Sequence, residues 1–125
     1  MNVVDSCGWL EYFADGSNAS FFAPALEDTE ALIVPSLSVL EVCKRVALQR
    51  GEIAARQAAD FMAKGRIVEL DAGTALASAL YSAKYQLPMA DSIILCTALH
   101  HHAILWTQDA DLKGHKDVKY KAKRA

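Results

Sequence analysis

The feature that most constrains this chain is the run NVVDSCGWL at residues 2–10. Val3 and Val4 are β-branched and favour a short strand, and Asp5 stands where that strand should end. Ser6 is suited to cap a helix, and apolar residues then recur at helical spacing. A strand that ends in a carboxylate and turns at once into a helix is typical of open parallel sheets, which hold ligands at the carboxyl ends of their strands.

The rest of the chain alternates between the strand and helix periodicities. We expect further strands at residues 31–34, 67–70 and 103–106, with an edge strand at 118–120. Helices are expected at 6–14, 18–26, 36–50, 52–64, 71–85 and 89–101, with a turn or short helix at 109–113. The alternation predicts an α/β domain with a mostly parallel central sheet of four to five strands. The helix at 89–101 is apolar nearly all round, so it should lie in the middle of the domain.

Length and composition favour a compact protein. The chain has 125 residues, 53% of them hydrophobic, which predicts a single domain over 1–125. The amino terminus lacks the basic region of a signal peptide, and no apolar run reaches the roughly 20 residues that span a bilayer. We therefore expect a soluble cytoplasmic protein with no membrane association. Cys7, Cys43 and Cys96 are far apart and should be buried reduced thiols.

The charge distribution neither requires nor excludes a nucleic-acid partner. A formal net charge of −2 counts against a nucleic-acid-binding protein, since such proteins are usually basic. However, six of the thirteen Lys and Arg residues fall between 113 and 124. This basic tail either binds a phosphate backbone or is simply solvated, and the sequence favours neither.

Four acidic residues occupy comparable junctions between strands and helices. Asp5 and Asp109 follow expected strands, whereas Glu41 and Asp91 open expected helices. If the sheet is parallel, all four gather at its carboxyl edge. Mutually repelling carboxylates in one cleft require a divalent cation, and an all-oxygen ligand set favours Mg²⁺ or Mn²⁺ over zinc. Such a site supports metal-assisted hydrolysis of a phosphodiester.

Two of these residues have structural explanations of equal or greater weight. Asp5 could serve as the N-cap of the helix that follows it. Ser38 and Glu41 fit the capping box S-x-x-E, in which the glutamate stabilises the start of a helix. Taken singly, Glu41 is better explained by this structural role.

For Asp91 and Asp109, the structural and functional explanations have different weights. Asp91 would interact favourably with a helix dipole, but a carboxylate at the head of a buried helix needs a counter-charge, so a functional role is favoured. Asp109 and Asp111 could both be ordinary turn residues. Thr107 could orient Asp109 through its hydroxyl or simply close the turn.

The order of the acidic motifs resembles that of PIN-domain ribonucleases, and the small VapC-type toxins of toxin–antitoxin pairs in particular. The matching segments are VVDS at 3–6, S-x-x-E at 38–41, ADSI at 90–93 with TA at 97–98, and LWTQDAD at 105–111. The resemblance spans residues 2 to about 112. Two departures are an apolar Leu112, where an aromatic residue is frequent, and the lysine-rich tail. Neither involves the acidic set.

This resemblance implies a PIN-like three-layer α/β/α fold and a magnesium-dependent (or manganese-dependent) endoribonuclease. It also implies an RNA substrate, a homodimer, and inhibition by a cognate antitoxin protein, as in a type II toxin–antitoxin system. The helical hairpin at 36–64 is our expectation for the dimer surface. The resemblance assigns the catalytic and metal-binding roles to Asp5, Glu41, Asp91 and Asp109, with supporting roles for Ser6, Thr107 and Asp111.

Other functions are compatible with parts of the sequence. A catalytically inactive PIN-like module that binds protein or RNA would keep the fold, but the complete acidic set argues against it. A phosphoryl-receiving signalling domain matches only in part, because Asp5 is followed by Ser6 and not by a second acid. A haloacid-type phosphatase is excluded, since position 7 is Cys7. Consecutive histidines at 100–102 diverge on a helix, so we expect a solvated helix end there and no metal site.

Overall fold

The computed structural model describes residues 1–124 of the chain. Its centre is a five-stranded sheet in the order β3-β2-β1-β4-β5, and every neighbouring pair is parallel. The strands are β1 (Asn2–Val4), β2 (Leu32–Pro35), β3 (Arg66–Val68), β4 (Ile104–Thr107) and β5 (Val118–Tyr120). The expected α/β class and the mostly parallel sheet are confirmed.

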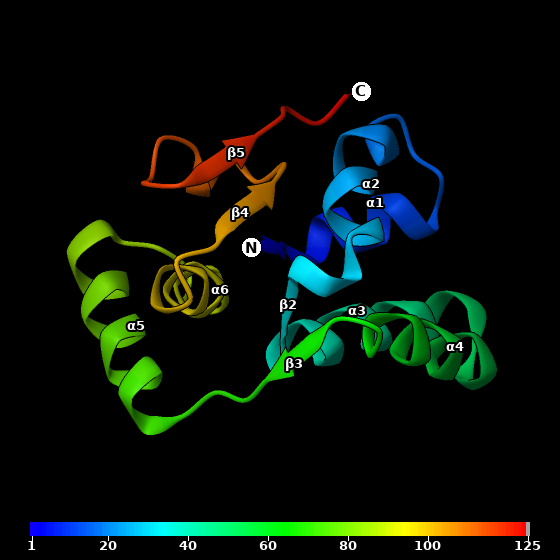
Figure 1. Ribbon diagram of the computed structural model, residues 1–125, viewed down its shortest axis with the longest axis horizontal. Helices are drawn as coiled ribbons and strands as arrows, with labels where there is room; N and C mark the ends of the chain where they lie inside the picture. The colour runs from blue at the N-terminus through cyan, green and yellow to red at the C-terminus, as the bar shows by residue number, and fades with distance from the viewer. Residues whose placement is uncertain (125) are drawn as a thin grey trace.

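Helices connect the strands and cover both faces of the sheet (Figure 1). They are α1 (Ser6–Phe13), α2 (Ala19–Glu27), α3 (Ser36–Arg50), α4 (Glu52–Met62), α5 (Ala72–Tyr85) and α6 (Met89–His100), with short 3₁₀ turns η1 (Thr29–Ala31) and η2 (Ala110–Leu112). Helices α1 to α4 pack mainly on one face, whereas α5 and α6 pack on the other. The result is the expected three-layer α/β/α arrangement.

The two apolar cores follow directly from the alternation of side chains along β1. Val4 points into a core with Trp9 and Phe22, while Val3 points into a second core with Ile94 and Leu95. All six side chains are at most 1% exposed. A central strand buried on both faces needs continuous β-branched residues, which explains why the chain begins with a pair of valines.

Helix α6 occupies the interior position that its composition predicts. It packs between α5 and the sheet, and residues 94–98 are all buried. The apolar residues on the different sides of this helix therefore pack against either α5 or the sheet. The hairpin of α3 and α4 is also confirmed (Figure 1), with Gly51 in the positive-φ conformation that ends α3.

Some sequence predictions differ from the structure. Strand β3 covers Arg66–Val68 and not 67–70, because Leu70 is 43% exposed and provides no buried face to continue the strand. The three cysteines are free thiols as expected, but only Cys96 is buried. Helix α4 ends at Met62, two residues before the expected end. Within the described residues, no helix has both the length and the apolar character needed to cross a bilayer.

The register of β1 and β4 fixes the position of the acidic edge. Val4 is paired with Trp106, and the backbone N–H of Asp5 donates to the carbonyl of Trp106 at 2.9 Å. Asp5 and Thr107 therefore lie side by side at the carboxyl ends of two adjacent strands. Helix α6 runs in the opposite direction to the strands, so its first turn reaches the same edge.

Candidate active site

Asp5 is the most deeply buried carboxylate of the site, at 5% exposure. Its Oδ1 accepts the backbone N–H of Ser6 at 2.8 Å, which makes it the N-cap of α1. Its Oδ2 accepts the hydroxyl of Thr107 at 2.8 Å. Burial raises the pKa of Asp5, and the charge of Asp109 adds to this, while the hydrogen bonds from Thr107 and Ser6 oppose it. The capping and site explanations of Asp5 are thus compatible, because its two oxygens have different partners.

Thr107 connects two of the acidic residues. Its fully buried hydroxyl donates to Asp5 and accepts the backbone N–H of Asp109 at 2.9 Å. Asp109 in turn caps η2, because its Oδ1 accepts the backbone N–H of Asp111 at 2.9 Å. Asp111 itself is exposed at the rim. The hydroxyl therefore fixes the carboxylate at the tip of β1 relative to the loop after β4.

Asp91, in the first turn of α6, is the third member of a group of carboxylates. One oxygen each from Asp5, Asp91 and Asp109 lies within 4.8 Å of the others. Partial burial, followed by the charges of Asp109 and Asp5, raises the pKa of Asp91 to about 7. The expectation that acids from β1, α6 and the end of β4 meet at one edge is correct for these three.

Glu41 lies next to this group but is not part of it. Its Oε1 accepts the hydroxyl of Ser6 at 2.7 Å, so Ser6 stands between Glu41 and Asp5. The capping-box explanation of Glu41 is wrong, because α3 begins at Ser36 and Ser38 already lies inside the helix. The hydroxyl of Ser38 is buried and has no hydrogen-bond partner among the described residues. Glu41 is therefore directed towards the site and not towards its own helix start.

Residues that the sequence did not indicate surround the site. The Sγ of Cys7 lies 3.5 Å from Asp5 Oδ2, and burial, with the charge of Asp5, raises the pKa of this thiol to about 12. Cys7 is therefore a neutral packing group and no nucleophile at neutral pH. Buried Asn18 donates to Gln108 Oε1 at 3.0 Å, and Gln108 donates to Glu11 Oε2 at 3.1 Å. No local sequence signal could indicate a contact between residues 18 and 108.

The three consecutive histidines have separate surroundings. His100 lies 3.1 Å from the hydroxyl of Thr74, whereas His101 contacts the carbonyl of Thr97 at 2.9 Å. His100 and His102 are exposed, as expected for a solvated helix end. Leu112, the departure from the aromatic pattern, is fully buried in the core beside α6.

The Thr107→Val substitution should weaken the site without unfolding the protein. Valine keeps the shape but cannot hold Asp5 or the backbone N–H of Asp109, and partners of this kind are worth about 10–100-fold in metal affinity or activity. We expect Mn²⁺ affinity, measured by calorimetry, to fall by this factor. Thr107→Ser retains the hydroxyl and should restore most of the affinity. Equal affinity of the valine variant and the wild type would show that the hydroxyl has no orienting role.

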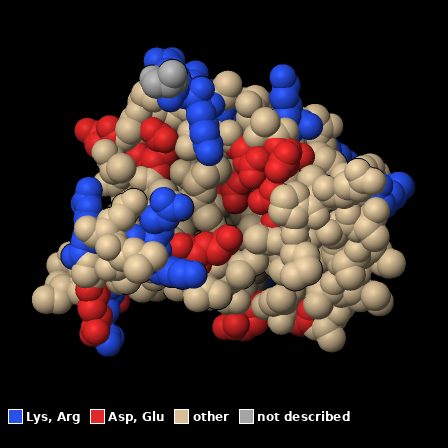
Figure 2. All heavy atoms as spheres, turned by 180° about the vertical axis from the view of Figure 1, so that it is seen from behind, with Lys and Arg blue, Asp and Glu red and all other residues tan. Residues whose placement is uncertain are grey.

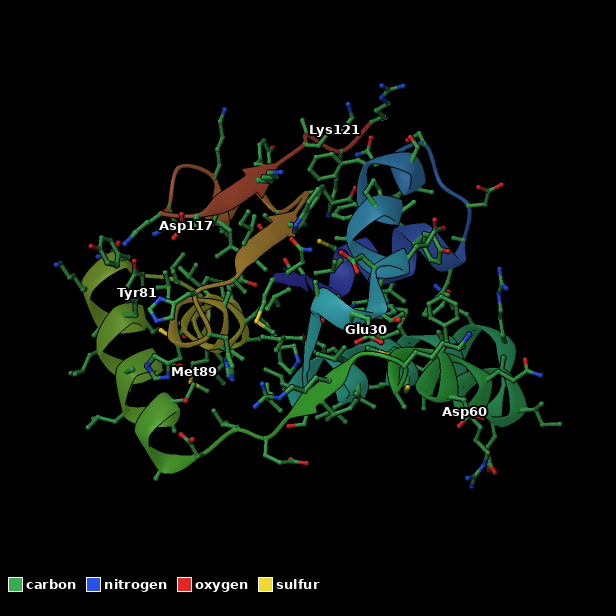
Figure 3. All side chains as sticks on the ribbon, in the orientation of Figure 1. Glu30, Asp60, Tyr81, Met89, Asp117 and Lys121 are labelled. Carbon is green, nitrogen blue, oxygen red and sulfur yellow. The ribbon has the colours of Figure 1, made fainter. Side chains whose placement is uncertain are left out.

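Asp91 should make the stability of the metal-free protein depend on pH. The folded state keeps the Asp91 proton up to about pH 7, whereas the unfolded chain loses it near pH 3.8. The unfolded state then binds fewer protons, so the free energy of unfolding should fall as pH rises between these values. Urea unfolding in EDTA at several pH values measures this slope. Asp91→Asn should reduce this slope and leave the smaller contribution of Asp5, whose pKa is also raised. Asp60→Asn, on the exposed side of α4 (Figure 3), should leave the slope unchanged.

Comparisons with known proteins agree with this geometry. The family model described as "PIN domain" matches residues 3–117. Among solved structures, a toxin–antitoxin complex from Klebsiella pneumoniae has a TM-score of 0.81 at 22% identity, covering 95% of this chain and 96% of that one. VapC20 from Mycobacterium tuberculosis, described as a sarcin-ricin loop cleaving toxin, has a TM-score of 0.78 at 13% identity, with 94% and 97% covered.

A third structure extends the similarity to a complex with nucleic acid. VapBC2 from Rickettsia felis, bound to a DNA fragment from their promoter, has a TM-score of 0.72 at 12% identity, covering 97% of each chain. At these identities the structures establish the shared fold alone. No curated protein matches this sequence. Since the family model covers nearly the whole domain, including β1 and the loop after β4, this chain is a member of the PIN-domain family.

Proposed function

We propose that this protein is a divalent-metal-dependent endoribonuclease of the cytoplasm and the toxin of a type II toxin–antitoxin system. The convergence of Asp5, Asp91 and Asp109 within 4.8 Å, at the carboxyl edge of a PIN-domain sheet, carries the proposal. The VapC-type neighbours support it, since they include one described as a sarcin-ricin loop cleaving toxin.

The residues at this edge fit a divalent cation. Three carboxylates lie together, and no Lys, Arg or His side chain of the described residues forms an ion pair with any of them. Partial burial raises the pKa of Asp91, and the negative charges of Asp109 and Asp5 raise it further. A cation would relieve the repulsion, and oxygen ligands favour Mg²⁺ or Mn²⁺. Asp5, Asp91 and Asp109 would hold it, and Glu41 is the fourth acid that we assign to the set.

A divalent ion held by Asp5, Asp91 and Asp109 would supply activation of a water and charge stabilisation of the leaving oxygen. Neighbouring residues of this chain orient the acidic side chains of the site. Thr107 and the N–H of Ser6 hold the Asp5 carboxylate in one orientation. Ser6 holds Glu41 at the side of the group, where its carboxylate can accept a proton from an attacking water. The thiol of Cys7 stays neutral, so no covalent intermediate on this thiol is expected.

The direct test is cleavage of a mixed RNA pool by the purified protein, free of any antitoxin, with Mg²⁺, Mn²⁺ or EDTA. We expect cleavage with either metal and none with EDTA. Asp109→Asn should abolish cleavage, whereas Asp60→Asn makes the same charge change on the exposed side of α4 and should cleave normally. Intact RNA under all metal conditions, from folded protein, would favour an inactive PIN-like binding module instead.

The antitoxin and the homodimer remain predictions from the family resemblance. The Klebsiella structure is described as a toxin–antitoxin complex, which supports a partner of this kind. The predicted dimer surface on the α3–α4 hairpin carries exposed Leu48 and Ile53. Helix α5 also exposes Leu76 and Leu80, so its outer face is a second apolar surface that such an assembly could cover.

A further inference from the structure

A cleft of about 550 Å³ adjoins the acidic site on the side of α1. Cys7 and Gln108 line the end of the cleft nearest the acids. The Sγ of Cys7 lies 3.5 Å from Asp5 Oδ2, and Gln108 immediately precedes Asp109. The cleft therefore begins one side chain away from the three carboxylates.

Helices α1, α3 and α4 form the walls of this cleft. Cys7 and Glu11 of α1 and its C-cap residue Ala14 line it at helical spacing, over a distance of about 10 Å along the axis. On α3, Arg45 and Gln49 follow Glu41 at intervals of four residues and so share its face. One face of α3 thus runs from the carboxylate beside Ser6 out into the cleft.

The charge of the cleft is opposite to that of the acidic site. Arg45, Arg50 and Lys123 line it, and no carboxylate of the described residues is within ion-pairing distance of any of the three. Glu11 is the one acidic residue of the lining, and its carboxylate already accepts hydrogen bonds from Gln108 and the backbone N–H of Asn18. Figure 2 shows groups of Asp and Glu near the middle of one face of the molecule, with Lys and Arg beside them.

We propose that this cleft binds the phosphates of single-stranded RNA beside the scissile bond, and that Arg45 and Arg50 are the phosphate contacts. The inference rests on the proposed nuclease function, because that function places the scissile bond at the acidic site and the neighbouring phosphates of the RNA in the cleft. A cleaved strand must continue past the metal-binding carboxylates, and unpaired guanidinium groups on an adjacent wall suit its phosphates. Base identity is not read by these contacts, so they would set affinity and register for any sequence.

Binding of a fluorescent, mixed-sequence single-stranded RNA in EDTA tests the cleft without cleavage. For single strands, the logarithm of the association constant falls with the logarithm of the salt concentration, with a slope of about 0.7 per phosphate contact. The double variant Arg45→Gln/Arg50→Gln loses two such contacts, so the magnitude of its slope should be smaller by about 1.4. At 0.1 M salt this corresponds to roughly 25-fold weaker binding, if the electrostatic contribution vanishes near 1 M. Arg56→Gln removes the same charge from α4 outside the cleft lining and should bind like the wild type.

Cleavage kinetics with Mg²⁺ separate this inference from the proposed function. If the wild type cleaves RNA, the double variant should raise KM by a factor similar to its loss of affinity, with kcat unchanged. Cleavage by the wild type with identical affinity, slope and KM in the double variant would overturn the cleft proposal and leave the nuclease standing. The expected binding results without any cleavage would retain the cleft and reject the nuclease.

A protein partner is the competing occupant. Poly-L-glutamate, added at the same charge concentration as unlabelled RNA, distinguishes the two. RNA should displace the fluorescent probe far more effectively than the peptide does. Equal displacement by both, or no RNA binding by the wild type at low salt, would overturn the RNA assignment.

Discussion

Asp5→Asn should abolish RNA cleavage, with a loss of more than about 100-fold, while the metal-free protein stays folded. Loss of an outer partner of a metal ligand is already worth about 10–100-fold, and Asp5 is proposed as a ligand itself. Asparagine has the same shape and can still accept the backbone N–H of Ser6 as helix N-cap. The local structure of α1 should therefore survive the loss of the charge.

The same substitution should have the opposite effect on stability. Burial and the neighbouring Asp109 raise the pKa of Asp5, which means that its ionised form opposes folding. At about pH 8 in EDTA, the asparagine variant should unfold at the same or a higher urea concentration than the wild type. Saturating Mg²⁺ or Mn²⁺ should stabilise only the wild type, by about 2.7 kcal/mol when the free metal is 100 times its Kd.

Circular dichroism during urea unfolding, with and without metal, measures both effects beside the cleavage assay. Asp60→Asn is the matched control, because it removes an exposed carboxylate from α4 (Figure 3). An Asp5→Asn variant that cleaves RNA at the wild-type rate would contradict the assignment. Metal stabilisation of both proteins to the same extent would exclude Asp5 as a ligand.

Trp9→Ala should produce the largest loss of stability among the changes considered. Trp9 is 1% exposed. Its ring packs edge-on against Phe61 of α4, with centroids 6.1 Å apart, and lies tilted against Phe13 at 5.8 Å. Replacing a buried tryptophan with alanine costs about 3–5 kcal/mol. This is a large fraction of the 5–15 kcal/mol that typically stabilises a domain.

Leu48→Ala is the control for Trp9→Ala, since Leu48 is 76% exposed on α3. Its effect should stay within about 0.5 kcal/mol. Urea unfolding followed by far-ultraviolet circular dichroism is the appropriate measurement, because the substitution removes a fluorescent probe. A loss below about 1 kcal/mol for Trp9→Ala would show that α1 and α4 are not held together by this ring.

Local sequence patterns determined the elements and the positions of the acids along them. The valine pair of β1, the all-round apolar character of α6 and the turn at Gly51 follow from periodicity and backbone preference, and the structure bears them out. Strand β3 was predicted with the wrong bounds because it has three residues and little buried surface, so its pattern carries little information.

The sequence also placed acidic residues just after β1 and β4 and near the starts of α3 and α6. It could not determine the sheet order, because β1 pairs with β4 across about a hundred residues, and local propensities do not encode such pairing. Once that order exists, Thr107 lies beside Asp5 and the hydroxyl links the two strands.

Only the tertiary structure decided which acids share a site. One carboxylate oxygen each of Asp5, Asp91 and Asp109 lies within 4.8 Å of the others. Glu41 instead accepts a hydrogen bond from Ser6, beside this group, although the sequence motifs give no reason to separate it from the other three acids. The arginine-lined cleft also depends on the packing of α3 and α4 against α1. Sequence spacing fixes on which element and face a side chain lies, but distances between side chains of different elements depend on how those elements pack.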